Sequence, residues 1–130
     1  DGHVATWTAR GFAPVDVAAL FVAAGGTSRE ALQPNRGWTD DQWAAAVERN
    51  QRDGLLATDD GITAAGREIV AAVEENTDVL AAAPFASLDD QGRRRLLDAL
   101  TPAAAAMSRS AIIPVVNPMG VRLLDDRPDP

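Results

Sequence analysis

The chain has 130 residues, which is typical of one domain with a single core. It has no cysteine, which excludes disulfides and thiolate metal sites and is typical of the reducing cytoplasm. The net charge of −7 has the wrong sign for a default nucleic-acid binder. No apolar run approaches the ~20 residues that span a membrane, so we expect no membrane contact.

The N-terminal part of the chain predicts two helices. Residues 1–10 place Val4 and Trp7 on one face of the first. Pro14 suits the first turn of the second helix, and residues 15–22 are apolar almost all round. A helix of this kind is usually central and buried.

The next part, residues 27–67, predicts a winged helix-turn-helix. Residues 27–30 have the pattern of a capping box, in which the Thr27 hydroxyl accepts from the backbone at the start of a helix. Residues 34–37, Pro-Asn-Arg-Gly, have the composition of a turn that ends this helix. The first helix of the motif therefore lies between these two signals.

The second helix of the motif has stronger signals. Residues 39–42 form another capping box, and Trp38 and Trp43 have the spacing of a hydrophobic staple across it. Gly54 supplies a left-handed stop at the other end. Residues 55–63 then predict a minimal two-strand wing around an acidic turn.

The C-terminal part predicts additional helices. Thr63 caps a long helix that ends ahead of Pro84, and Ser87 caps another. Residues 101–102, Thr-Pro, predict a restart of the chain as N-cap and first residue of a new helix, and the alternative is a kinked continuation of the same helix.

The expected fold is therefore mainly α, a winged helix-turn-helix with a two-strand wing and additional C-terminal helices. We expect one domain over residues 1–124. From Ile112 the chain is β-branched and proline-rich, which predicts an extended tail. Residues 125–130 are expected to be disordered.

Several passages resemble known regulators. Residues 54–56 and 62–67 resemble the GL…LTxxGR passage of MarR-type winged-helix regulators. Residues 1–3 (DGH), 36–40 (RGWTD) and 117–120 (NPMG) are more similar to a SalK-like bacterial helix-turn-helix family. The resemblance covers nearly the whole chain and implies the C-terminal half of a longer protein. It also implies a homodimeric transcriptional repressor that responds to small aromatic ligands.

The charges argue against tight DNA binding. The second motif helix and its end, residues 40–53, carry two arginines and four acidic residues, a net charge of −2. The expected wing turn, residues 58–61, carries Asp59 and Asp60 and no arginine. Phosphate contacts depend on cations, so the backbone of a duplex is repelled by both elements. If DNA is bound at all, the candidate residues are Arg36, Gln42, Arg49 and Arg52.

We expect no enzyme, no catalytic residues and no cofactor. His3 is the only histidine, and the chain lacks cysteine and tyrosine. Adjacent acidic pairs diverge on a helix and are typical of caps and turns. Residues 1–3 could chelate Cu(II) or Ni(II) through a free amino terminus, but a helix start with His3 hydrogen-bonded nearby is the preferred interpretation, so no metal site is expected. The run Arg93 to Arg95 spreads around a helix and predicts a solvated face.

The aromatic residues also predict a candidate ligand pocket. Trp7 lies on a terminal helix, and residues 117–120 could fold back towards His3. The candidate pocket residues are His3, Trp7, Asn117 and Met119. The simpler interpretation of the aromatic residues is core packing.

Apolar residues near the C-terminus have no evident partner within a winged-helix core. They are Leu96, Leu97, Leu100, Met107, Ile112, Ile113, Val115 and Val116. We expect the N-terminal helix to contact the C-terminal helices, and the remaining apolar surface to bind a second copy or the N-terminal half of the same protein. The leading function is a regulatory or protein-interaction module; the alternatives are a MarR-like DNA-binding regulator and a small-molecule sensor.

Overall fold

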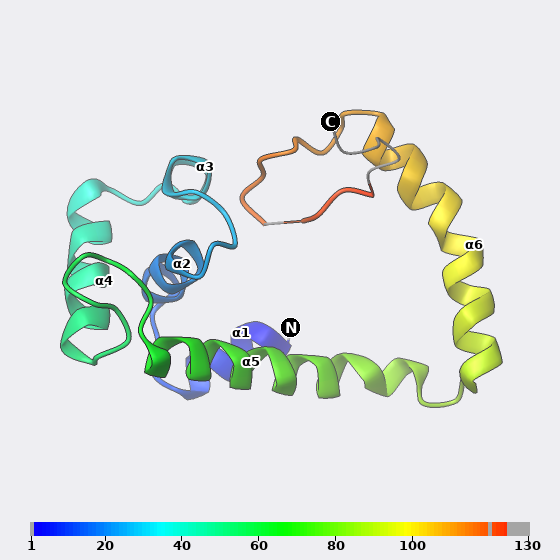
Figure 1. Ribbon diagram of the computed structural model, residues 1–130, viewed down its shortest axis with the longest axis horizontal. Helices are drawn as coiled ribbons and strands as arrows, with labels where there is room; N and C mark the ends of the chain where they lie inside the picture. Colours follow the sequence, from blue (N-terminus) through cyan, green and yellow to red (C-terminus); the bar gives the residue numbers. More distant parts are fainter. Residues whose placement is uncertain (1, 120, 125–130) are drawn as a thin grey trace.

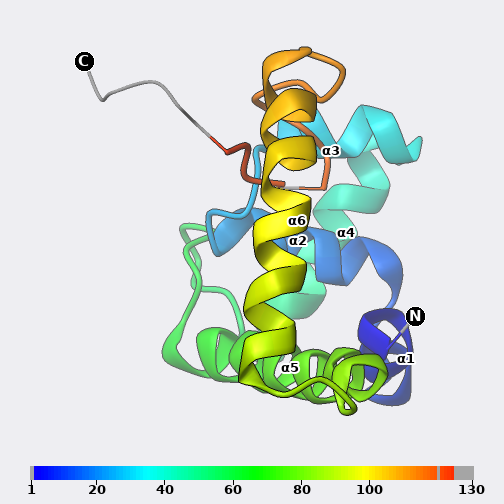
Figure 2. The same ribbon diagram turned by 90° about the vertical axis from the view of Figure 1, so that its right-hand side faces the viewer.

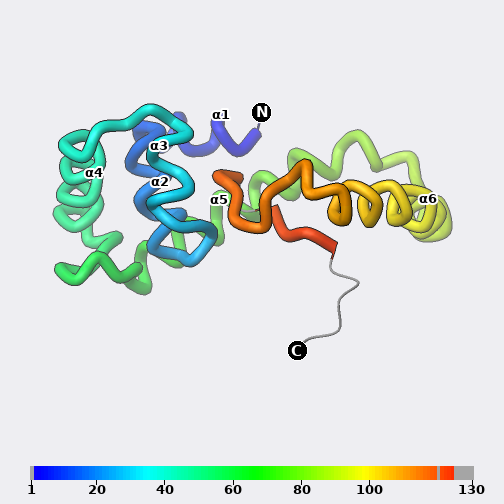
Figure 3. The backbone as a smooth tube through the Cα atoms, turned by 90° about the horizontal axis from the view of Figure 1, so that it is seen from above, coloured from blue at the N-terminus to red at the C-terminus, as the bar shows by residue number. Residues whose placement is uncertain are grey.

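The computed structural model describes residues 2–119 and 121–124, and in these ranges the protein is built from helices. They are α1 (Gly2–Ala9), α2 (Pro14–Ala23), α3 (Arg29–Arg36), α4 (Asp40–Arg52), α5 (Ala64–Ala82), a 3-10 turn (Ala83–Phe85) and α6 (Asp90–Arg109). Helices α1 to α5 form a body, and α6 stands apart from it, as Figure 1 shows. The segment after α6 returns to the body near the loop between α2 and α3 (Figures 1 and 3). None of the described helices is both long and apolar enough to cross a membrane.

Helix α2 is the centre of the body. It contacts α3, α4 and α5, and its residues Ala18, Ala19 and Leu20 are buried. Leu20 packs in one cluster, and the two alanines pack in another. The buried members of the first cluster are Trp7, Leu20, Leu55, Leu56 and Val73; those of the second are Ala18, Ala19, Leu32, Trp43 and Ala46. The prediction of a central, buried second helix is confirmed.

Helix α3 begins and ends at other residues than its sequence signals indicate. Its N-cap is Ser28, whose Oγ accepts a hydrogen bond from the Ala31 amide at 3.2 Å, so the predicted Thr27 cap is wrong. The helix continues through Pro34 and ends at Gly37, which has a φ of 70°. The left-handed glycine, and not the proline, stops this helix, because only glycine adopts that backbone conformation without strain.

Helix α4 matches its prediction closely. The Gln42 amide donates to Thr39 Oγ1 at 3.2 Å, and the Thr39 amide donates to Gln42 Oε1 at 2.9 Å, which completes the capping box. Gly54 has a φ of 73° and follows the end of the helix. The predicted glycine stop is therefore confirmed.

The predicted two-strand wing is wrong: the described residues contain no strand, only an isolated antiparallel bridge between Leu56 and Ile62. The reason is that the helix caps take up the neighbouring backbone groups. The Leu55 and Leu56 amides both donate to the carbonyl of Asn50 at the end of α4. The Thr63 amide donates to the Leu55 carbonyl and the Ala57 amide to the Gly61 carbonyl, which are the two backbone bonds of the bridge, and the pairing ends there because Thr63 is the N-cap of α5.

The start of α5 lies against this loop at Gly66. A Cβ at Gly66 would collide with the Leu55 carbonyl and with the Ile62 side chain, so glycine is required for this close approach. Further along, α5 packs against α1, where a Cβ at Gly2 would be 2.8 Å from the Leu80 side chain. The N-terminal helix therefore contacts α5 and not α6.

Helix α6 is one continuous helix with Pro102 inside it, so the continuation interpretation is right and the restart is wrong. Its N-cap is Asp89, whose Oδ1 accepts from the Gly92 amide at 2.7 Å, in place of the predicted Ser87. None of its twenty residues is buried. Figure 2 shows α6 crossing in front of the body. The predicted disordered segment, residues 125–130, lies outside the described residues.

Candidate functional site

The helix-turn-helix is fixed by a polar network that the sequence analysis did not find. Buried Gln33 donates through Nε2 to the Trp38 carbonyl at 3.1 Å and to Asp40 Oδ1 at 2.9 Å. Arg29 donates to Gln33 Oε1 at 2.6 Å and to Asp40 Oδ1 at 2.8 Å. These bonds set the angle between α3 and α4, because they join the start of each helix to the turn. The only sequence signal was the i, i+4 spacing of Arg29 and Gln33.

A second network attaches α4 to α2. Arg49 donates through Nε and Nη2 to Asp16 Oδ1, at 2.9 and 2.6 Å. The other oxygen of Asp16 accepts from the Ala13 amide at the start of α2. Asn50 is 1% exposed and donates to the carbonyls of Asp16 and Ala46, at 3.0 and 3.1 Å. Arg49 is therefore held against α2 by a buried carboxylate.

The outward face of α4 is acidic. Its exposed charged residues include Asp41, Glu48 and Arg52. In a helix-turn-helix, residues at the N-terminal end of the second helix contact base edges. Here that end presents Asp41 beside Gln42, whose Oε1 is used in the capping box. Negative charge therefore lies where a duplex would approach.

The four candidate DNA-binding residues do not form one surface. Arg36 is exposed at the end of α3 and lines a groove described below, together with residues of α1. Gln42 and Arg52 are exposed at opposite ends of α4, and Arg49 is paired with Asp16. Next to α4, the acidic turn is attached by Gln51, whose Nε2 donates to Asp60 Oδ1 at 2.8 Å.

A groove of about 680 Å³ lies between α1, α2, α3, α5 and the tail. It brings together three of the four candidate pocket residues, His3, Trp7 and Met119. Trp7 is buried, and its indole stacks edge-on against Phe12 with ring centroids 5.0 Å apart. The lining also includes Trp38, Arg36 and Glu74. The groove thus combines aromatic walls with a guanidinium and a carboxylate.

The Nε2 atom of His3 lies between Trp7 of its own helix and Glu74 of α5. Trp7 Nε1 donates to His3 Nε2 at 3.1 Å, and Glu74 Oε1 lies 3.4 Å from that nitrogen. The hydrogen bond with Trp7 joins two residues of α1 beside the groove, and the approach to Glu74 links α1 to α5.

The fourth candidate pocket residue, Asn117, is a structural residue of the tail. It is 3% exposed, and its Nδ2 donates to the carbonyls of Pro114 and Val121 at 3.2 and 3.0 Å. Its Oδ1 accepts from the amides of Met119 and Val121. The side chain is occupied in forming this turn, which places Met119 in the groove.

One carboxyl group has a shifted pKa. A hydrogen bond from its own backbone and another from Ser28 hold the pKa of Glu30 below its usual range. Because the folded-state pKa is lowered, the contribution of this group to stability is present at neutral pH and is lost as the pH falls through that pKa. Glu30 lies in the first turn of α3, where a negative charge suits the helix dipole.

These features define a helix-turn-helix protein, with α3 and α4 as the motif and a helical body around it. The sequence profile of a helix-turn-helix family matches residues 1–114 of the chain. The chain therefore belongs to this helix-turn-helix family. No curated protein and no solved structure matches it at a significant level. Among the described residues, no group of acidic or histidine side chains is arranged to hold a metal ion.

Proposed function

We propose that this protein is a regulatory helix-turn-helix module that acts through contacts with protein partners, and that α4 alone binds duplex DNA weakly. The observation that carries the proposal is the charge on the exposed face of α4. Asp41 and Glu48 lie on that face, and Asp16 holds Arg49 against α2. Each phosphate contact gains affinity from a cation that displaces counterions, and this face offers few.

The proposal also includes a biological role and a location. The resemblance to SalK-like and MarR-type proteins supports a role in transcription control in the cytoplasm. A binding module of this kind has no catalytic role. A MarR-like DNA-binding regulator is the alternative, and duplex titrations separate it from our proposal.

We expect neutralisation of the α4 face to increase DNA affinity. The double variant Asp41→Asn/Glu48→Gln should bind a labelled mixed-sequence duplex about threefold to tenfold more tightly than the unmodified protein at low salt, because two repulsive surface charges are removed. Fluorescence anisotropy at two salt concentrations measures this, and the difference should shrink at the higher one.

The matched control for this titration is Glu75→Gln/Asp98→Asn, which removes the same two charges at exposed positions of α5 and α6. It should leave the affinity unchanged. Equal affinities of the unmodified protein and the double variant would show that α4 does not face the duplex, and would contradict the electrostatic argument.

The groove supports a second candidate function, a sensor of small aromatic ligands. Its walls contain Trp7 and Trp38, and Arg36 supplies a cation at its edge. A flat ring can stack against the partly exposed indole of Trp38, with buried Trp7 behind it, and a guanidinium pairs with a carboxylate in two parallel hydrogen bonds. This arrangement suits a small aromatic carboxylate.

For this function we expect benzoate at millimolar concentrations to change the tryptophan fluorescence saturably. Arg36→Gln should weaken that binding at least about tenfold, because hydrogen bonds to charged groups contribute ~1.5–3 kcal/mol each. Arg52→Gln, an exposed arginine outside the groove, is the control. If fluorescence stays constant, or if both variants bind alike, the sensor function is wrong.

A further inference from the structure

The protein exposes more surface than a compact chain of its mass. Its accessible surface is 9005 Å², whereas a folded monomer of 13.7 kDa exposes about 6,600 Å². The eight residues outside the described ranges could add at most about 1,300 Å² if they were as accessible as an unfolded chain. An excess on the order of 1,000 Å² or more therefore belongs to the described part of the chain.

Much of this surface is apolar and lies on α6 and the segment after it. Along α6, Leu97, Leu100 and Met107 are 64%, 54% and 51% exposed. With Ala104 between them, these residues have the 3-4-3 spacing of a seam that packs against a second helix. Six further large apolar side chains are exposed after α6: Ile112, Val115, Val116, Met119, Val121 and Leu124.

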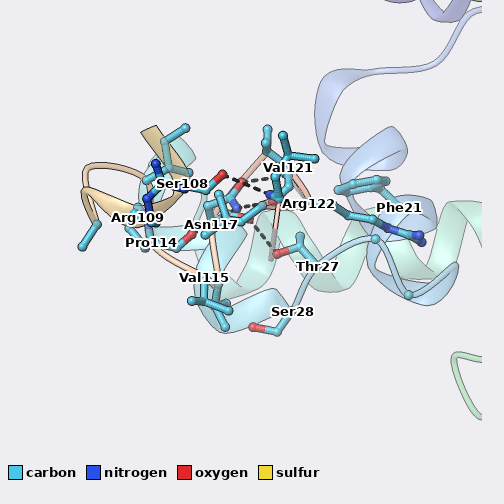
Figure 4. Close-up of a pocket in the computed structure, with 17 residues that line it drawn as sticks. Phe21, Thr27, Ser28, Ser108, Arg109, Pro114, Val115, Asn117, Val121 and Arg122 are labelled. Atoms are coloured by element: carbon cyan, nitrogen blue, oxygen red, sulfur yellow. Dashed lines mark hydrogen bonds between the residues drawn. The ribbon is translucent and has the colours of Figure 1, made fainter. Parts of the chain in front are cut away.

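The described part of the tail, residues 110–119 and 121–124, nevertheless docks at a defined place on the body. Thr27 Oγ1, in the loop between α2 and α3, donates to the Asn117 carbonyl at 3.0 Å, as Figure 4 shows. Thr27 and Asn117 line one cavity, together with Phe21 from the body and Val121 from the tail. Beyond Asn117, residues Pro118 and Met119 reach the groove beside α1. The tail is thus bound to the body, whereas the helix that carries it has no buried residue.

We propose that two copies of this chain exchange their C-terminal arms, so that the tail of each copy docks on the body of the other. The connection between α5 and α6, residues 83–89, contains Pro84 and one 3-10 turn and is the hinge of the exchange. The Thr27–Asn117 hydrogen bond is kept in the exchanged dimer, but there it joins the body of one copy to the tail of the other. The two α6 helices then lie between the two bodies, where their exposed seams pack against each other.

The area supports a second copy as the partner. An excess of at least about 1,000 Å² on each of two copies amounts to roughly 2,000 Å² in total, the lower end of the range for permanent homodimers. A two-fold axis brings the same surface of both copies together, and an apolar seam is complementary to itself. Exchange of an identical segment keeps the tail–body contact that a single copy already has, and the packing of the α6 seams is the contact that it adds. The inference does not depend on DNA or ligand binding.

Engineered cysteines can test the exchange, because the chain has none of its own. Ser28 and Val116 are exposed and line the same cavity. Ser28 follows Thr27 in the chain and Val116 precedes Asn117, so both lie next to the Thr27–Asn117 hydrogen bond. Two differently tagged chains, one with Ser28→Cys and one with Val116→Cys, are co-expressed and treated with a short bismaleimide. A chain that carries both cysteines is the comparison.

The proposal predicts a cross-link between the two different tags, and no cross-linked product from either single variant alone. Light scattering should give twice the mass of 13.7 kDa. If the double-cysteine chain is cross-linked only within itself and migrates as a monomer, the tail docks on its own body and the exchange is wrong. If neither sample is cross-linked, the tail does not dock near Thr27, and the proposal is equally contradicted.

A second variant tests the seam separately. Leu97→Asp/Leu100→Asp should convert the dimer to a monomer while the helical circular dichroism is retained, because α6 has no buried residue to lose. Ala99→Asp, on another face of the same helix, should remain a dimer. A dimer that survives the double substitution would show that the α6 seams do not meet.

Discussion

Replacing Trp43 with alanine is expected to lower the free energy of unfolding by about 3–5 kcal/mol. Trp43 is 5% exposed and packs in the cluster between α2, α3 and α4. Its ring lies 6.4 Å from that of Trp38 across the N-cap of α4, and the Arg29 guanidinium lies 5.4 Å from its centre. The substitution removes the staple, a cation–π contact and a large core side chain together.

Chemical denaturation followed by circular dichroism measures this loss. The control is Trp38→Ala, which removes the half-buried partner and should cost clearly less, since less area leaves the core. A loss below about 1 kcal/mol for Trp43→Ala would mean that the α2–α4 contact does not depend on this ring.

The second large effect is expected at Asp16. Asp16→Ala should cost about 2–4 kcal/mol, because it leaves the Arg49 guanidinium without its carboxylate and the Ala13 amide without its cap. The loss of stability should stay below the largest values found when one partner of a fully buried ion pair is removed, because the Arg49 side chain is 40% exposed. The measurement is again unfolding by denaturant.

Two variants control for this effect. Asp16→Asn keeps one oxygen acceptor and should lose less than the alanine variant. Asp41→Ala removes an exposed carboxylate of α4 and should change stability by less than about 0.5 kcal/mol. Equal losses in Asp16→Ala and Asp41→Ala would show that the Asp16–Arg49 pair does not hold α4 to α2.

The elements that the sequence predicts correctly are those with local signals. The capping box of Thr39 and Gln42 and the left-handed Gly54 depend on contacts within a few residues. The central position of α2 follows from its apolar composition. Where two neighbouring residues both suit an N-cap, the predicted start of the helix is wrong. Thr27 and Ser28 are such a pair: Ser28 caps α3, and the Thr27 hydroxyl donates to the Asn117 carbonyl of the tail.

The candidate functional surfaces depend on contacts between residues that are far apart in the sequence. Nothing near Arg49 indicates that Asp16, 33 residues away, holds it against α2. Likewise, the predicted wing is limited to one bridge because the Asn50 carbonyl accepts from the Leu55 and Leu56 amides and Thr63 already begins α5. The candidate pocket residues His3, Trp7 and Met119 line the groove, and their role in ligand binding stays a prediction; the structural role of Asn117 depends on a turn that only the folded tail reveals.

The central claim is that α4 presents an acidic face that does not bind duplex DNA tightly. Selection of bound duplexes from a random-sequence library, followed by titration of any enriched sequence at several salt concentrations, tests it most directly. We expect no enriched motif, and a Kd no tighter than ~10⁻⁶ M, in the range of non-specific binding. An enriched motif bound with a Kd below about 10⁻⁸ M and a steep salt dependence would contradict the claim.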